Sequence, residues 1–126
     1  MSVLSDARSE LAQLLEAAGI DGVRDYLPER MSPPLVYVTG GSPALEPGQV
    51  YGMHLLRYDL TAVARSGANE TVTDALDELV VKVLAALDGN AWAFETAGRP
   101  FMQSADTKAF IAQRLTFITN RPVLGD

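Results

Sequence analysis

The clearest pattern of hydrophobic and polar positions lies in residues 54–87. Apolar and polar side chains alternate over residues 54–65, and this period of two predicts a strand buried on one side. After turn residues at 66–69, apolar residues recur every three or four positions, which predicts an amphipathic helix that ends at Asp88-Gly89-Asn90. The strand residues expected to face the core are Leu56, Tyr58, Leu60, Ala62 and Ala64. The apolar stripe of the helix consists of Val72, Leu76, Leu79, Val80, Val83, Leu84 and Leu87.

The same two periods place the other elements. Helical spacing over residues 3–18 predicts a first helix, and Gly19 follows it as a C-terminal cap. A short extended piece is expected at residues 23–27. Alternation or compact apolar runs predict further strands at residues 35–39, 91–97 and 110–119. Residues 101–108 are interpreted as a polar connection that contains Asp106.

Residues 40–53 interrupt these patterns. They contain four glycines and two prolines and join two predicted strands, where a hairpin connection usually takes two to five residues. We therefore expect a long flexible loop there, and long loops often carry function. Gly40-Gly41-Ser42 lacks the lysine and the second glycine that a phosphate-binding loop requires.

The order of predicted elements is helix, strand, strand, helix, strand, strand. This order predicts an α+β fold with both helices packed on one face of a mainly antiparallel sheet. Residues 1–126 are expected to form a single domain, with the flexible loop at residues 40–53 and a short C-terminal tail at residues 120–126.

Composition narrows the class of function. The chain has no cysteine, which favours a reducing compartment, and no apolar run as long as a membrane span, so we expect a soluble protein. A net charge of −6 disfavours DNA binding, because attraction to phosphate needs a basic surface. Such a charge suits a conduit through which DNA passes without specific binding.

The sequence predicts no catalytic, cofactor-binding or metal-binding residue. His54 is the only histidine, and a metal site usually needs several imidazoles or thiolates. No Gly-x-Ser-x-Gly elbow is present to supply a nucleophilic serine for a triad. Arg57 and Asp59 lie two apart on a predicted strand, so they share a face, and pairing within the sheet is favoured over catalysis.

The arrangement resembles that of the tail terminator (tail completion) proteins of long-tailed bacteriophages. The resemblance rests on a short N-terminal helix, PPLVYV, a Gly/Pro loop, YGMHLLRYDLTAVAR, NETVTDALDELVVKVLAAL and ADTKAFIAQRLTFITNR. It implies a non-enzymatic structural protein of the virion, located at the tail–head junction and assembled in the host cytoplasm. It also implies a homo-oligomeric ring, typically of six subunits, that caps the tail tube and meets the head connector protein.

Within this interpretation, residues 40–53 are the candidate contact with the tail tube protein. Its expected apolar anchors are Leu45, Val50 and Tyr51, and Glu46 is its only charge. Two alternatives remain open at this stage. One is another head–tail connector, or neck, protein, and the other is a small enzyme or ligand-binding α+β domain that uses His54 and Asp59.

Overall fold

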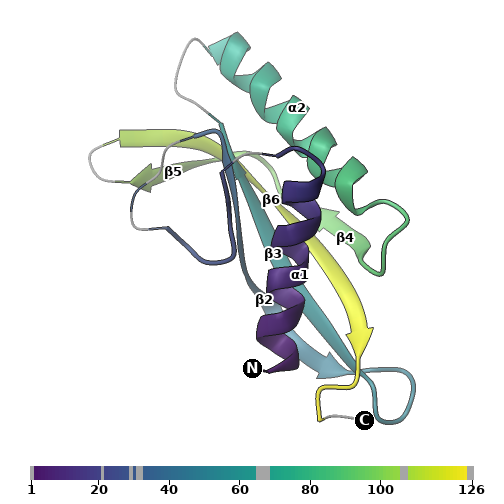
Figure 1. Cartoon of the computed structure of the whole chain (residues 1–126). Coiled ribbons are helices and arrows are strands. Elements are labelled where there is room, and N and C mark those ends of the chain that lie inside the picture. Colours follow the sequence, from purple (N-terminus) through teal and green to yellow (C-terminus); the bar gives the residue numbers. More distant parts are fainter. Residues whose placement is uncertain are drawn as a thin grey trace.

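The computed structural model describes residues 2–20, 22–28, 30, 33–64, 69–105 and 108–124 (Figure 1). The fold is α+β, as predicted, with two helices and a six-stranded, mainly antiparallel sheet. The elements are α1 (Val3–Ala17), β1 (Val23–Arg24), β2 (Leu35–Pro47), β3 (His54–Val63), α2 (Asn69–Leu87), β4 (Ala93–Ala97), β5 (Phe101–Ala105) and β6 (Lys108–Arg121). The predicted turn at residues 66–68 and Asp106 lie outside the described residues.

The sheet is built around the pair β3 and β6. Their antiparallel register runs without a break from His54↔Arg121 to Val63↔Ala112. The strand order is β1-β2-β3-β6-β4, and β5 pairs with the N-terminal half of β6 on the same side as β4. β1 is the one parallel strand among the described residues, and it meets β2 at Val36 and Tyr37.

The main core lies between the helices and the alternate residues of the central strands. Apolar side chains of α1 and α2 form one buried cluster with Leu56, Leu60 and Leu115. Each of these three leucines is completely buried, and full burial of such a side chain stabilises the fold by about 1.5–3 kcal/mol. The alternation predicted for residues 54–65 therefore places the expected face in the core.

Local signals set the ends of both helices. Ser2 caps α1, since its hydroxyl accepts a hydrogen bond from the Ser5 backbone N–H at 3.1 Å. In turn, the Ser5 hydroxyl accepts one from the Ser2 backbone N–H, which completes a capping box. The chain leaves α2 through Gly89, whose φ of 78° is the left-handed conformation that glycine adopts at low cost. The bounds of α1 and α2 lie within one residue of those predicted.

Polar contacts fix α1 on the sheet. The hydroxyl of Tyr58 on β3 donates to the Leu4 carbonyl at 2.7 Å, and Trp92 Nε1 donates to Glu10 Oε2 at 2.8 Å. Burial raises the pKa of Tyr58. Burial by itself would raise the pKa of Glu10, but hydrogen bonds from Arg121 and Trp92 outweigh it, so the pKa is lowered. Hydrogen bonds as well as apolar packing therefore hold α1 in place.

The structure corrects the predicted loop at residues 40–53. β2 continues to Pro47, and residues 48–53 alone make the turn. The register passes from Gly40↔Tyr58 to Leu45↔Leu56, so four residues of β2 stand opposite the single residue Arg57. These four residues, Gly41-Ser42-Pro43-Ala44, form a bulge in β2. β1 pairs only with Val36 and Tyr37, so beyond them β2 is an outer strand, where prolines are tolerated.

Two further boundaries differ from the prediction. Residues 101–105, expected to be a polar connection, form β5, which is a strand because it pairs with the start of β6 from Phe101↔Ala112 to Ala105↔Lys108. β6 extends to Arg121, since Arg121 pairs with His54, so the predicted tail at residues 120–126 begins two residues later. The sheet has six strands where the sequence pattern predicted four.

Candidate functional site

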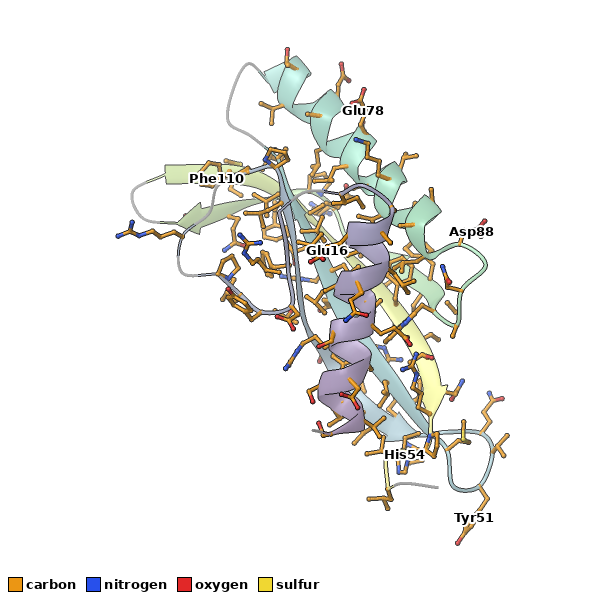
Figure 2. All side chains as sticks on the ribbon, in the orientation of Figure 1. Glu16, Tyr51, His54, Glu78, Asp88 and Phe110 are labelled. Carbon is orange, nitrogen blue, oxygen red and sulfur yellow. The ribbon has the colours of Figure 1, made fainter. Side chains whose placement is uncertain are left out.

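The predicted contact residues fall into two different environments. Leu45 and Glu46 belong to β2 and pair with Leu56 and Leu55 of β3. Val50 and Tyr51 lie in the turn and are 67% and 103% exposed. Figure 2 shows Tyr51 at the end of the hairpin, pointing away from the rest of the molecule. The structure therefore divides the four residues into a paired strand segment and an exposed tip.

The turn is compact. Gly48 N donates to the Met53 carbonyl at 2.8 Å, and Met53 N donates to the Val50 carbonyl at 3.0 Å. Gly52 has a φ of 85°, a conformation that a side chain would strain. These bonds hold Val50 and Tyr51 outward on a short, defined turn, which reduces the entropy that a partner must remove on binding.

A third exposed residue lies at the same end of the molecule. Arg121 pairs with His54, so residues 122–124 leave β6 beside the β2–β3 turn (Figure 1). Leu124 is 91% exposed there. Leu124 belongs to the predicted tail and is not among the predicted contact residues, because only the pairing of β6 with β3 brings it near the turn. Val50, Tyr51 and Leu124 together are called the tip surface below.

Glu46 is engaged within the chain. Its Oε1 accepts from Arg57 Nη1 at 2.5 Å, and the same nitrogen donates to the Pro43 carbonyl at 2.8 Å. On the other side, Arg57 Nε and Nη2 donate to both carboxylate oxygens of Glu95 at 2.8 and 2.9 Å. One guanidinium thus links the β2 bulge to β4, across β3 and β6.

This ionic contact shifts two pKa values in opposite directions. The hydrogen bonds that Arg57 donates to Glu95 and then to Glu46 raise the pKa of Arg57. The hydrogen bond from Arg57 lowers the pKa of Glu95. Gly41 leaves room for the arginine, because a Cβ at Gly41 would lie 2.5 Å from Arg57 Cγ. Gly41 therefore accommodates Arg57 beside the bulge.

Asp59 makes a second polar group on the same face. Its Oδ1 accepts from Thr116 Oγ1 at 2.7 Å, and Oδ2 lies 3.8 Å from Arg114 Nε. Arg114 in turn stacks on Phe101, with its Cζ 5.2 Å from the ring centroid. Arg57 and Asp59 both pair within the sheet, as predicted: Arg57 with residues of β2 and β4, and Asp59 with residues of β6.

His54 and Asp59 lie on opposite faces of β3, because they are five residues apart on a strand. That separation is about 16 Å along the strand, so the two side chains share no site. His54 Nδ1 is buried and has no hydrogen-bond partner among the described residues. Within the described ranges, no group of three His, Cys, Asp or Glu residues is placed to hold a metal ion.

Comparison with known protein families found no matching family model, and comparison with curated proteins found no match. In the part of the chain that the structure describes, no helix is both long enough and apolar enough to span a bilayer.

Proposed function

We propose that this protein is a tail terminator of a long-tailed bacteriophage. In this role, copies of the chain form a ring, typically of six subunits, on the end of the completed tail tube. The ring then meets the head connector protein, and DNA passes through it. The proposal starts from the resemblance in sequence and takes its support from the tip surface, the strand edge and the charge.

The observation that carries the proposal is the tip surface. Three large side chains lie at one end of the molecule, each more than half exposed: Val50 and Tyr51 in the β2–β3 turn, and Leu124 after β6. Aromatic residues of this kind are frequent anchors of protein interfaces. A defined turn that projects such anchors from a small domain is suited to docking on another protein, which we take to be the tail tube.

The free edge of the sheet supports assembly. All five residues of β4 are exposed, including Phe94, and β4 occupies the end of the strand order. An uncovered edge strand invites pairing or packing with another chain, and closing a ring removes that liability. The net charge of −6 disfavours adhesion of DNA to the inner wall.

The test replaces the two turn anchors by serine in Val50→Ser/Tyr51→Ser. Both side chains are exposed, so we expect thermal unfolding to be unchanged. We also expect the variant to fail to bind purified tail tubes and to fail to restore tail completion in a complementation assay.

Met102→Ser is the matched control, because Met102 is 63% exposed and lies on β5. It should behave as the unaltered protein in both assays. Normal binding to tubes and normal completion by the double serine variant would contradict the proposed role of the tip surface.

A further inference from the structure

The last strands of the sheet form the basic part of an acidic chain. Residues 96–121, which span the end of β4, β5 and β6, carry four basic side chains and one carboxylate, a net of +3 in a chain of −6. The basic residues are Arg99, Lys108, Arg114 and Arg121, and the carboxylate is Asp106. Arg121 is already bonded to Glu10 of α1. An anion that approaches this part of the chain therefore meets an excess of positive charge.

A cavity in this part of the sheet opens on the face away from the helices. Leu115 belongs to the main core, so Arg114 and Thr116 on either side of it in β6 face the opposite way. The cavity has a volume of about 450 Å³. Its lining comes from the end of β4, the start of β5 with the connection between them, and β6, and consists of Thr96, Gly98, Arg99, Phe101, Arg114 and Thr116. Two of the four basic residues therefore border one cavity.

Arg114 is held in place, but its terminal nitrogens remain available. Its guanidinium stacks on the ring of Phe101, with Cζ 5.2 Å from the ring centroid, and its Nε lies 3.8 Å from Asp59 Oδ2. The side chain is 51% exposed, and neither Nη nitrogen makes a hydrogen bond with another described residue. Stacking and one long ion pair thus orient the guanidinium, and both Nη groups can donate to a ligand.

The second guanidinium is placed by the connection between β4 and β5. Gly98 N donates to the Arg114 carbonyl at 2.9 Å, and the Gly98 carbonyl accepts from Gln113 Nε2 at 2.8 Å. Phe101 then pairs with β6 as the first residue of β5. Arg99 lies between these two anchored points, is exposed, and makes no ion pair with a described residue. Its charge is therefore held close to that of Arg114 and is not neutralised within the described part of the chain.

One carboxylate lies close to the two guanidiniums. Asp59 accepts a hydrogen bond from Thr116 Oγ1 at 2.7 Å and forms the long contact with Arg114. Glu95 on β4 has both carboxylate oxygens bonded to Arg57. Among the described residues, two positive charges therefore border the cavity against the single charge of Asp59. This excess is available to an anion.

A second cavity with two arginines differs in this respect. Arg24 and Arg30 border an open cavity of about 460 Å³ beside β1. Residues 20–30, however, carry more carboxylates than arginines, namely Asp21, Asp25 and Glu29. Asp25 also shares a cavity with Arg24. The net charge of this segment is negative, so its cavity serves as the comparison site in the test below.

We propose that the cavity bordered by Arg99 and Arg114 binds a phosphate group, either as inorganic phosphate or as part of a small phosphate monoester. A carboxylate has two oxygens, which one guanidinium occupies, whereas a phosphate monoester has three terminal oxygens and nearly two negative charges. A phosphate group can accept from both guanidiniums together, and the hydroxyl of the exposed Thr96 can donate to a remaining oxygen. The site lies within one copy, so the inference is independent of the proposed ring.

An NMR titration of the nitrogen-labelled full chain tests the proposal. Inorganic phosphate and glycerol phosphate are added in separate titrations at constant ionic strength, and the Nε–H signals of the arginines are followed. We expect saturable shifts for Arg99 and Arg114. Acetate should bind at least about tenfold more weakly, because it offers one pair of oxygens and a single charge. Absence of saturation with both phosphate compounds, or equal affinity for acetate, would overturn the proposal.

The two phosphate compounds also distinguish the source of the ligand. Equal dissociation constants would assign the site to the phosphate group alone. Tighter binding of glycerol phosphate would show that the cavity also contacts the organic part, and tighter binding of inorganic phosphate would show that it excludes an ester. All three results keep the phosphate site.

Substitutions locate the site in the chain. Arg99→Gln and Arg114→Gln each remove one charge, and each should weaken the binding of inorganic phosphate about tenfold, measured on the arginine that remains. Arg24→Gln/Arg30→Gln is the matched control, because it removes two exposed arginines from the comparison site and should leave the affinity unchanged. Unchanged binding by Arg99→Gln, or loss of binding by the control, would contradict the assignment.

Circular dichroism verifies that each variant is folded. Arg114→Gln loses the contacts with Asp59 and Phe101 and could disturb the sheet, whereas Arg99 is exposed and has no ion pair with a described residue. The result for Arg99→Gln therefore decides the proposal even where Arg114→Gln is unfolded.

Discussion

The two faces of the sheet are stabilised by different interactions, although the same strands form both: apolar packing on one face and mainly ion pairs and hydrogen bonds on the other. On the helix-covered face, Leu56 and Leu60 of β3 are completely buried in an apolar cluster. On the opposite face, called the open face below, Arg57 and Asp59 of the same strand form hydrogen bonds and ion pairs with side chains on β2, β6 and β4. The stabilisation from buried apolar area is non-directional and adds up over many side chains. The stabilisation from hydrogen bonds and ion pairs depends on the geometry of a few contacts.

This difference predicts unequal tolerance of substitution. A charge on the helix-covered face has no partner and must be desolvated, whereas a lost charge on the open face can be replaced in part by water. The open face also has its own small apolar cluster, formed by Leu35, Tyr37, Val63, Phe110 and Ala112, with Phe101 packed against it. Polar contacts therefore dominate only its central part.

The largest effect is expected from Leu60→Asp. Leu60 is 0% exposed and packs in the main core, so an aspartate would be an unpaired buried charge that costs several kcal/mol, enough to unfold a domain of ordinary stability. Circular dichroism should show loss of the folded signal. Leu55→Asp is the matched control, because Leu55 is half-exposed on the opposite face of the same strand. A folded Leu60→Asp variant would contradict the assignment of faces.

The sequence predicted the helix-covered face well because a single local rule produces it. Alternation in residues 54–65 and the stripe in α2 each follow from one element, without knowledge of its neighbours. The open face could not be predicted in this way. Arg57 bonds to Glu46, eleven residues earlier, and to Glu95, thirty-eight residues later, and only the strand order brings these residues together.

The missed boundaries have a related cause. Residues 40–47 have a composition typical of a loop, but pairing with β3 extends β2 through a bulge that Arg57 occupies. β5 has no clear pattern of its own and becomes a strand because β6 provides a partner. Of the candidate contact residues, Val50 and Tyr51 lie in an exposed turn as composition indicated, whereas Glu46 is bonded to Arg57.

Arg57→Met should have an intermediate effect. Methionine keeps the apolar stem but removes the bonds to Pro43, Glu46 and Glu95, and we expect a loss of about 1–2 kcal/mol in the free energy of unfolding. Urea unfolding measures this loss. Arg99→Met is the control, since Arg99 is exposed and makes no ion pair with a described residue. Equal free energies of unfolding for the two variants would show that the contacts of Arg57 do not stabilise the fold.

The same variant changes the response to acid. The pKa of Glu95 is lower in the folded protein than the usual 4.5, so the unfolded chain takes up protons first as the pH falls. The stability that Glu95 contributes is therefore complete above about pH 4.5 and is lost as the pH falls through the folded pKa. Arg57→Met lacks this contribution, so its melting temperature should decline less between pH 7 and about pH 3. A steeper decline than that of the unaltered protein would contradict the sign.

The smallest effect, and the sharpest comparison, comes from two buried threonines on the open face. Thr61 is 1% exposed and its Oγ1 has no hydrogen-bond partner among the described residues, whereas Thr116, 9% exposed, donates to Asp59 at 2.7 Å. Valine has nearly the same shape as threonine, so each substitution removes only a hydroxyl. Thr61→Val should be neutral or stabilise by up to about 1 kcal/mol, because an unpaired buried hydroxyl is removed, whereas Thr116→Val should destabilise by about 1 kcal/mol. Opposite shifts in the urea midpoint would show that bonding decides the outcome on this face; equal losses would mean that the Thr61 hydroxyl is satisfied in solution.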